Sequence, residues 1–180
     1  MPNHVINEII FTGVDSIAEG RIMAATCNGE GEVDFNLLVP MPVNVWRGSV
    51  GKVHTEAFGA GCIGLDWARQ NWGTKWNAYS HKPIERTLDA LVLRFETAWS
   101  PPYPWLVALF NTCGGFAHNW LDEGASWSKT GLFIKNGEWG DDWKVADADE
   151  ALHRHMHKLH WGVEQFDDEP SPPSETPHVK

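Results

Sequence analysis

The chain has 180 residues, a net charge of −10 at pH 7 and eleven tryptophans. This length suits one domain, and so many large aromatic side chains can form a sizeable core without disulfide or metal cross-links. The excess of acidic residues excludes phosphate binding along the whole surface, because affinity for nucleic acid depends on clustered lysine and arginine.

The charge is distributed unevenly along the chain. Residues 1–45 hold six acidic residues and one basic residue, and residues 138–180 hold eleven acidic and four basic residues. Residues 46–137 hold seven acidic and nine basic residues and are slightly positive. The middle of the chain can therefore present a local basic patch on an acidic protein.

The cysteines and the apolar runs indicate the compartment. Cys27, Cys62 and Cys113 are odd in number, widely spaced and without a Cys-x-x-Cys pair, which predicts free thiols in a reducing environment and no structural zinc site. No apolar run approaches about 18 residues, and the N-terminus lacks the basic and apolar regions of a signal peptide. We therefore expect a cytoplasmic protein with no membrane span.

The first half of the chain begins with a strand and a helix. The run VINEIIFTG (residues 5–13) is rich in isoleucine and ends at a glycine, which is typical of a strand. Asp15 or Ser16 can cap a helix over residues 15–26. The next expected elements are an extended segment over residues 31–46, a glycine-rich stretch over residues 48–64 and a short helix over residues 65–72.

A second strand and a helix follow in the middle of the chain. In RTLDALVLRFETAWS, the residues Leu91, Leu93 and Phe95 share one face of a strand, and the intervening residues lie on the other. Pro104 suits the first position of a helix over WLVALF, because the missing amide hydrogen has no partner there in any case.

The remainder of the chain is rich in hairpin signals and then becomes acidic. Turns are indicated at residues 123–124 and at the Asn-Gly pair 136–137, and Asn-Gly between extended runs is typical of a hairpin. Residues 162–180 are acidic and proline-rich, which predicts a disordered tail. The elements together predict one α+β domain over residues 1–161 with an antiparallel sheet.

The last helix, DADEALHRHMHKLHW, carries an apolar stripe and a histidine stripe. Asp147 or Asp149 can cap it, and its apolar stripe consists of Leu152, Met156 and Leu159. Imidazoles one turn apart can share a transition metal, but no glutamate stands where a metalloprotease base is needed. We therefore interpret the second stripe as a solvated helix flank and predict no metal site there; it consists of His153, His157 and His160.

The segment GAGCIG (residues 59–64) matches the dinucleotide-binding pattern G-x-G-x-x-G. That pattern needs a buried strand before it and a long helix after it. The preceding VGKVHTEAF is a poor buried strand, and the helix that follows is soon interrupted by Gly73. We interpret the segment as a flexible loop and predict no cofactor.

The candidate binding residues begin in the stretch NWGTKWNAYS. It brings Trp72, Lys75, Trp76, Asn77 and Tyr79 together within ten residues. Gly73 makes a break at least as favourable as a continuous helix through this stretch. We expect Trp72 in the core, Trp76 at the boundary between core and surface, and Lys75 free to meet a partner.

Two further candidates, Glu96 and Trp99, follow the second strand. Glu96 comes after core-like residues and can be buried and hydrogen-bonded, or can accept a proton. Aromatic residues with basic neighbours are typical of a single-stranded nucleic-acid platform, although we expect most of the tryptophans to pack in the core. The basic neighbours here are Arg69, Lys82 and Arg86.

Three stretches together carry a resemblance to a known family: MPNHVINEIIFTG, DWARQNWGTKWNA and LRFETAWSPPYPW. They resemble the YubB-like family with a ferredoxin-like domain, a family of uncharacterised plasmid and phage proteins. The resemblance extends over roughly residues 1–145, and His4 departs from it because a tryptophan is expected there. It implies a ferredoxin-like antiparallel sheet with helices packed on one face. It implies no iron–sulfur cluster, since three spaced cysteines cannot supply four thiolates.

The functional hypothesis follows from this resemblance and from the lack of a catalytic signature. We expect a mobile-element accessory protein that is a non-catalytic binding module for a host protein, such as a defence or gene-expression component. The alternative is RNA or single-stranded DNA binding through the central aromatic and basic segment. An enzyme that acts at Glu96 is the third hypothesis, and it requires a pocket that joins Glu96 to Lys75.

Overall fold

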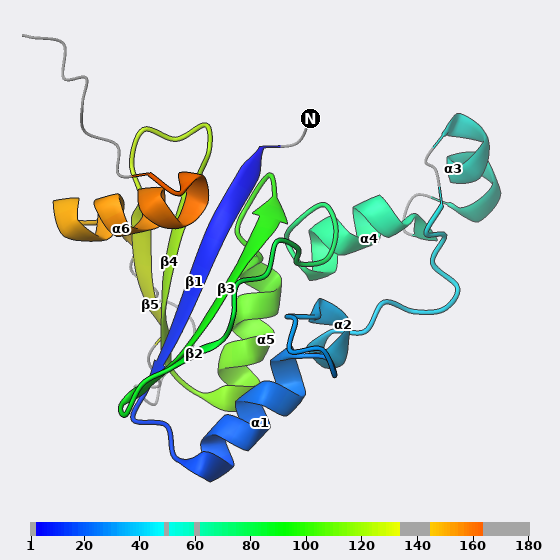
Figure 1. Ribbon diagram of the computed structural model, residues 1–180. Helices are drawn as coiled ribbons and strands as arrows, with labels where there is room; N and C mark the ends of the chain where they lie inside the picture. Colours follow the sequence, from blue (N-terminus) through cyan, green and yellow to red (C-terminus); the bar gives the residue numbers. More distant parts are fainter. Residues whose placement is uncertain (1–2, 49–50, 60–61, 134–144, 164–180) are drawn as a thin grey trace, which may run out of the picture.

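The computed structural model describes residues 3–48, 51–59, 62–133 and 145–163. Its strands are β1 (His4–Thr12), β2 (Glu85–Arg86), β3 (Ala90–Ala98), β4 (Phe116–Asp122), β5 (Lys129–Phe133) and β6 (Val145–Asp147). They form an antiparallel sheet in the order β2-β3-β1-β4-β5-β6, and Figure 1 shows β1 between β3 and β4. The predicted α+β class with an antiparallel sheet is confirmed.

Strand β1 lies at the centre of the sheet. It pairs with β3 along its whole length and with β4 from Val5 to Ile10. All residues from Val5 to Ile9 are buried, because neighbouring strands cover both edges and helices cover both faces. Two of these buried residues, Asn7 and Glu8, are polar, and each is hydrogen-bonded to a side chain of β3.

The helices are α1 (Ser16–Thr26), α2 (Phe35–Leu38), α3 (Lys52–Phe58), α4 (Gly64–Asn71), α5 (Tyr103–Cys113) and α6 (Glu150–Trp161). Asp15 caps α1 by accepting hydrogen bonds from the backbone of Ile17 and Ala18, as predicted. Helices α1, α2, α4 and α5 enclose the main core against the sheet. Its largest fully buried side chains include Phe11, Phe35, Phe95, Ile9, Ile22, Leu93, Trp105, Leu106 and Leu109.

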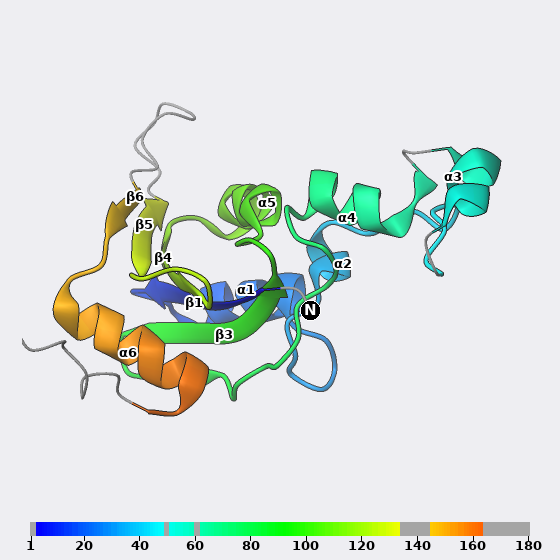
Figure 2. The same cartoon turned by 90° about the horizontal axis from the view of Figure 1, so that it is seen from above.

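Helix α6 packs on the opposite face of the sheet, as Figure 2 shows by placing α5 and α6 on different sides. Its predicted apolar stripe is confirmed, since Met156 is fully buried against Ile6 and Leu121 in a second small core. Asp149 is the cap, with its carboxylate 2.8 Å from the amide nitrogen of Leu152. The expectation that helices occupy one face only is therefore wrong for α6.

Two short helices depart from the expectations. Residues 35–38 form α2 inside the segment expected to be extended, because Asp34 accepts a hydrogen bond from the amide of Asn36 and starts a helical turn. Residues 52–58 form α3 within the glycine-rich stretch and stand away from the sheet (Figures 1 and 2). The Trp46 ring anchors α3 by stacking with His54 and Phe58.

The hairpin between β4 and β5 confirms the turn predicted at residues 123–124. The turn predicted at 136–137 and most of the predicted tail, residues 164–180, lie outside the described residues. Within the part of the chain that is described, every helix is too short or too polar to cross a membrane.

Candidate functional site

The stretch NWGTKWNAYS leaves helix α4 and turns back toward the sheet. α4 ends at Asn71, and Gly73 has a φ of +85°, a left-handed conformation that favours glycine. A Cβ atom at Gly73 would lie 2.4 Å from Pro104 Cδ, so a larger residue does not fit. Trp72 is buried and donates from Nε1 to the carbonyl of Val39, which confirms it as core.

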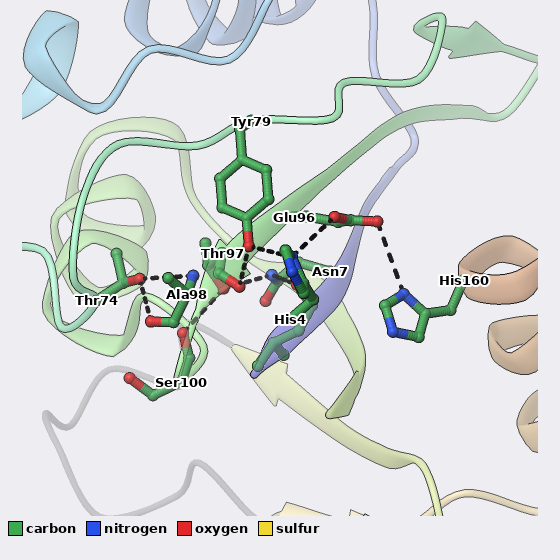
Figure 3. A network of polar contacts seen from close by, with 10 residues as sticks. His4, Asn7, Thr74, Tyr79, Glu96, Thr97, Ala98, Ser100 and His160 are labelled. Carbon is green, nitrogen blue, oxygen red and sulfur yellow. Dashed lines mark hydrogen bonds and ion pairs between the residues drawn. The ribbon is translucent and has the colours of Figure 1, made fainter. Parts of the chain in front are cut away.

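The chain after Gly73 is fastened to the end of β3, and Figure 3 shows this network. Thr74 Oγ1 donates to the carbonyl of Ala98 at 2.8 Å and accepts from the Ala98 amide at 3.1 Å. The amide of Tyr79 donates to the carbonyl of Glu96 at 3.1 Å, and the Glu96 amide donates back at 2.8 Å. Both ends of residues 74–79 are therefore hydrogen-bonded to the end of β3.

Asn77, one of the candidate binding residues, has a structural role. Its Nδ2 donates to Asp34 at 2.7 Å, and its Oδ1 accepts from the amides of Phe35 and Ala78. These bonds attach the loop to the start of α2. Three of the hydrogen-bonding capacities of the Asn77 side chain are thus used within the protein.

Tyr79 and Glu96 belong to a polar network below the loop (Figure 3). The Tyr79 hydroxyl donates to the carbonyl of Thr97 at 3.0 Å and lies 2.8 Å from His4 Nδ1. Burial and the nearby carboxylates of Glu96 and Glu123 hold the pKa of Tyr79 well above its usual range. The phenol therefore stays neutral and serves as a hydrogen-bond donor.

The Glu96 carboxylate points toward α6 and lies between two histidines. Its oxygens are 3.5 Å from His4 Nδ1 and 3.7 Å from His160 Nδ1. Burial lowers the pKa of His160, although Glu96 and Glu123 oppose this. Glu96 is not among the described residues that line the pocket containing Lys75.

The histidine stripe of α6 is buried, so its interpretation as a solvated flank is wrong. His153 Nδ1 accepts a hydrogen bond from the backbone amide of Ser128 and lies 3.0 Å from the Ser128 hydroxyl oxygen. The His153 ring stacks on the Trp127 ring, with 4.0 Å between the ring centroids. His157 is buried and lies 2.9 Å from the carbonyl of Val163. Among the described residues, no group of three or more histidine, cysteine, aspartate or glutamate side chains has an arrangement that could hold a metal ion.

An exposed group of aromatic and basic side chains lies at the outer end of the loop. Lys75 Nζ is 4.5 Å from the ring centroids of both Trp76 and Trp99, and Arg69 Cζ is 5.6 Å from the Trp99 ring. We call Arg69, Lys75, Trp76 and Trp99 the indole–cation cluster. Lys75, which the sequence predicts to be free to meet a partner, lies between these two indole rings and makes cation–π contacts with both.

Both tryptophans of this cluster are unusually placed. Trp76 is 41 % exposed, as expected for a boundary residue, and Trp99 is 42 % exposed. Trp99 also has a φ of +76°, which is rare for a bulky residue and costs about 1 to 3 kcal/mol. Its amide donates to the carbonyl of Asn3 at 2.9 Å, so the strained backbone is fixed while the indole faces solvent.

A pocket of about 350 Å³ adjoins the indole–cation cluster. It lies between the segment that contains Met41 and Arg47 and helix α4, and it shares Lys75 and Trp76 with the cluster. Its walls are formed by Asn36, Met41, Trp46, Arg47, Gly48, Gly64, Leu65, Ala68, Trp72, Lys75 and Trp76. Sequence reasoning identified the α4 side of this pocket but missed the side near Trp46, since no local pattern links residues 41–48 to residues 65–76.

Two cationic residues, Arg47 and Lys75, line the pocket, and Arg69 lies against Trp99 in the adjoining cluster. Within the described parts of the chain, Arg47, Arg69 and Lys75 form no ion pair with a carboxylate. Lys82 and Arg86, the other predicted basic neighbours, lie elsewhere: Lys82 bonds through its amide to Arg94, and Arg86 pairs with Glu19. The seven candidate residues thus separate into core, structural network and exposed cluster.

Comparisons of the chain with protein-family models, with curated proteins and with solved structures found no match.

Proposed function

We propose that this protein is a non-catalytic binding module that engages another protein through the indole–cation cluster and the adjoining pocket. The observation that carries this proposal is the exposed pair Trp76 and Trp99, held around Lys75 by a loop that is hydrogen-bonded to β3. Tryptophan and arginine dominate the binding energy of protein interfaces. A rigid support reduces the entropy lost on binding.

The proposal includes an origin in a plasmid or phage and a host protein as the partner, acting in the cytoplasm. Support comes from the three stretches that resemble the YubB-like family. The order of elements also fits, because β1, a helical segment, β2, β3, α5 and β4 follow the β-α-β-β-α-β pattern of ferredoxin-like domains. On this proposal β5, β6 and α6 are additions to the ferredoxin-like unit.

RNA or single-stranded DNA binding is the second candidate. The specific observation in its favour is Lys75 between two exposed indoles, since stacking surfaces combined with basic residues bind single strands. Against it stands the small number of cations, namely Arg47, Arg69 and Lys75, on a protein with a net charge of −10.

Chemical cross-linking in lysate of a bacterial host, followed by mass spectrometry, tests the main proposal. We expect one host protein to be cross-linked by the wild type and depleted about tenfold with Trp76→Ala or Trp99→Ala, because each removes an interface anchor. The matched control is Trp161→Ala, which removes an indole that is 43 % exposed on α6. The purified partner should then bind with the same ranking of variants.

Two results contradict the proposal. One is a set of cross-linked proteins that is identical for the wild type and for Trp99→Ala. The other is tight binding of a labelled oligothymidylate that weakens steeply with salt and is lost in Lys75→Ala, which would establish the nucleic-acid alternative.

A further inference from the structure

We propose that the partner binds this site with an acidic segment that carries one large apolar side chain. The apolar side chain enters the pocket beside Trp76, and the flanking carboxylates pair with Arg47, Lys75 and Arg69. This inference rests on the proposed function, because it specifies the chemistry of the partner at the same site.

The interior of the pocket is suited to an apolar group. Met41, Leu65, Trp72 and Trp76 supply apolar walls, and the pocket volume of about 350 Å³ is at the lower end of the range of ligand pockets. Such a space admits a single large side chain rather than a folded element. Burying an aromatic side chain there removes about 150 to 250 Å² of its surface from water, which is the main source of affinity.

The rim of the pocket is suited to carboxylates. Arg47 donates from Nη2 to the carbonyl of Met41 at 2.9 Å, which fixes its guanidinium and leaves further N–H groups for a partner. Lys75 is fixed between two indoles. Because these cations have no carboxylate partner among the described residues, charge-assisted hydrogen bonds to an acidic segment are gained without breaking an internal ion pair.

The same observations favour a peptide over a nucleic acid. A single strand needs a basic groove that follows several phosphates. Here Arg47 and Lys75 line one pocket, Arg69 lies in the adjoining cluster, and the chain as a whole is acidic, with a net charge of −10. Repulsion from the rest of the surface is screened beyond about 8 to 10 Å at ordinary ionic strength, so a short acidic segment can still approach the local patch.

Fluorescence anisotropy with defined peptides on the full-length protein tests the inference. The probe is a fluorescein-labelled pentapeptide with one tryptophan flanked on each side by two aspartates. The comparison probes replace the tryptophan with alanine or the aspartates with lysines, and a labelled oligothymidylate represents nucleic acid. We expect saturable binding of the first probe alone, weaker at about 300 mM than at about 50 mM sodium chloride.

Substitutions in the pocket and the indole–cation cluster test whether the peptide binds there. Lys75→Met and Arg47→Met should each weaken binding of the acidic peptide about tenfold, since each loses one charge-assisted hydrogen bond. Lys75→Arg should retain most of the affinity, which separates loss of charge from loss of structure. Arg21→Ala, which removes an exposed charge on α1, should leave binding unchanged.

Several outcomes overturn the inference. Equal binding of the lysine-containing peptide shows that charge is irrelevant, and binding of oligothymidylate alone establishes nucleic acid as the ligand. If no peptide binds while a Trp99-dependent host partner is still cross-linked, the acidic-segment inference fails and the proposed function stands. If the acidic peptide binds as expected but no host partner depends on Trp99, the host-protein function fails and the site chemistry stands.

Discussion

Glu8 shows how a single buried side chain can organise one face of the sheet. It lies on β1 facing α6, where its carboxylate accepts hydrogen bonds from Arg94 at 2.8 Å, Asn119 at 3.0 Å and His155 at 2.8 Å. Burial alone would raise the pKa of Glu8, but these hydrogen bonds outweigh it and lower the pKa to about 2. The charged form of Glu8 therefore links strands β1, β3 and β4 to helix α6.

Glu8 should make stability dependent on pH in the acid range. Its pKa is lower in the folded protein than the ordinary value of 4.5, so its contribution is complete above pH 4.5 and is lost as pH falls toward 2. The shift corresponds to about 3 kcal/mol. We expect the free energy of unfolding by urea to fall less steeply between these pH values in Glu8→Gln than in the wild type. Parallel curves for the two proteins would contradict this role.

Trp99 provides a prediction about backbone strain. Trp99→Ala and Trp99→Gly both remove the indole, but only glycine adopts a φ of +76° without a steric penalty. Trp99→Gly should therefore be more stable than Trp99→Ala by about 1 kcal/mol, measured by urea unfolding. A less stable glycine variant would mean that Trp99 is not strained. The strain of a solvent-exposed indole supports selection for binding rather than for stability.

Single residues were predictable where local chemistry decides their environment. Trp72 follows an amphipathic helix and lies in the core, as expected. The contact of Lys75 with Trp99 was not predictable, because the two residues are distant in sequence. Arg47 belongs to the site for the same reason, since only the folded chain brings it to the pocket beside Lys75.

At the scale of elements, helix α6 is attached to the sheet by a small apolar core with buried histidine side chains beside it. Met156 is fully buried between Ile6 and Leu121, while His153 and His157 are buried beside it. A helix of this length gains most of its stability from such packing rather than from its own propensity. The attachment of α6 therefore depends strongly on the few residues on this face.

Met156→Ala should loosen α6 without unfolding the main core. The cavity that it leaves costs about 3 kcal/mol, and the loss falls on the contact between α6 and the sheet. We expect faster proteolysis within residues 150–161, measured by limited digestion and mass spectrometry. Arg154→Gln is the control on the same helix, since its exposed ion pair with Glu150 contributes about 0.5 kcal/mol or less. Equal digestion of both variants would refute this assignment.

Some elements are predicted by local sequence signals, and others depend on tertiary contacts. β1, β3 and α6 follow apolar patterns, whereas α1 was expected from a capping residue and α5 from a proline at the start of the helix. α2 and α3 were missed, because helices of four and seven residues carry too little periodicity to be recognised. α3 exists where Trp46 stacks on its side chains, which is a tertiary contact.

At the scale of the whole molecule, buried neutral histidines lower the free energy of unfolding as the pH becomes mildly acidic. Burial lowers the pKa of His118 to about 3, and burial also lowers the pKa values of His153 and His160. Each of these groups binds a proton more readily in the unfolded chain. Their contribution to stability is complete above pH 6.5 and falls as pH decreases below that value.

The whole protein should therefore lose stability well above the range in which Glu8 titrates. His118 alone should account for about 2 kcal/mol between pH 7.5 and pH 5. We expect the free energy of unfolding by urea to fall over this interval, and to fall by about 2 kcal/mol less in His118→Gln. A wild-type protein with constant stability between pH 7.5 and 5 would contradict the assignment of these histidines as neutral and buried.

The sequence by itself determined the α+β class, the main strands and helices, and the stretch that holds Trp72 and Trp76, because apolar periodicity and turn residues act locally. It also singled out Trp99. Only the tertiary structure decided that α6 covers the second face of the sheet and that its histidines are buried. Only the tertiary structure brought Arg47 and Lys75 to one pocket and placed Trp99 against Lys75, since contacts between distant segments are set by packing and leave no local pattern.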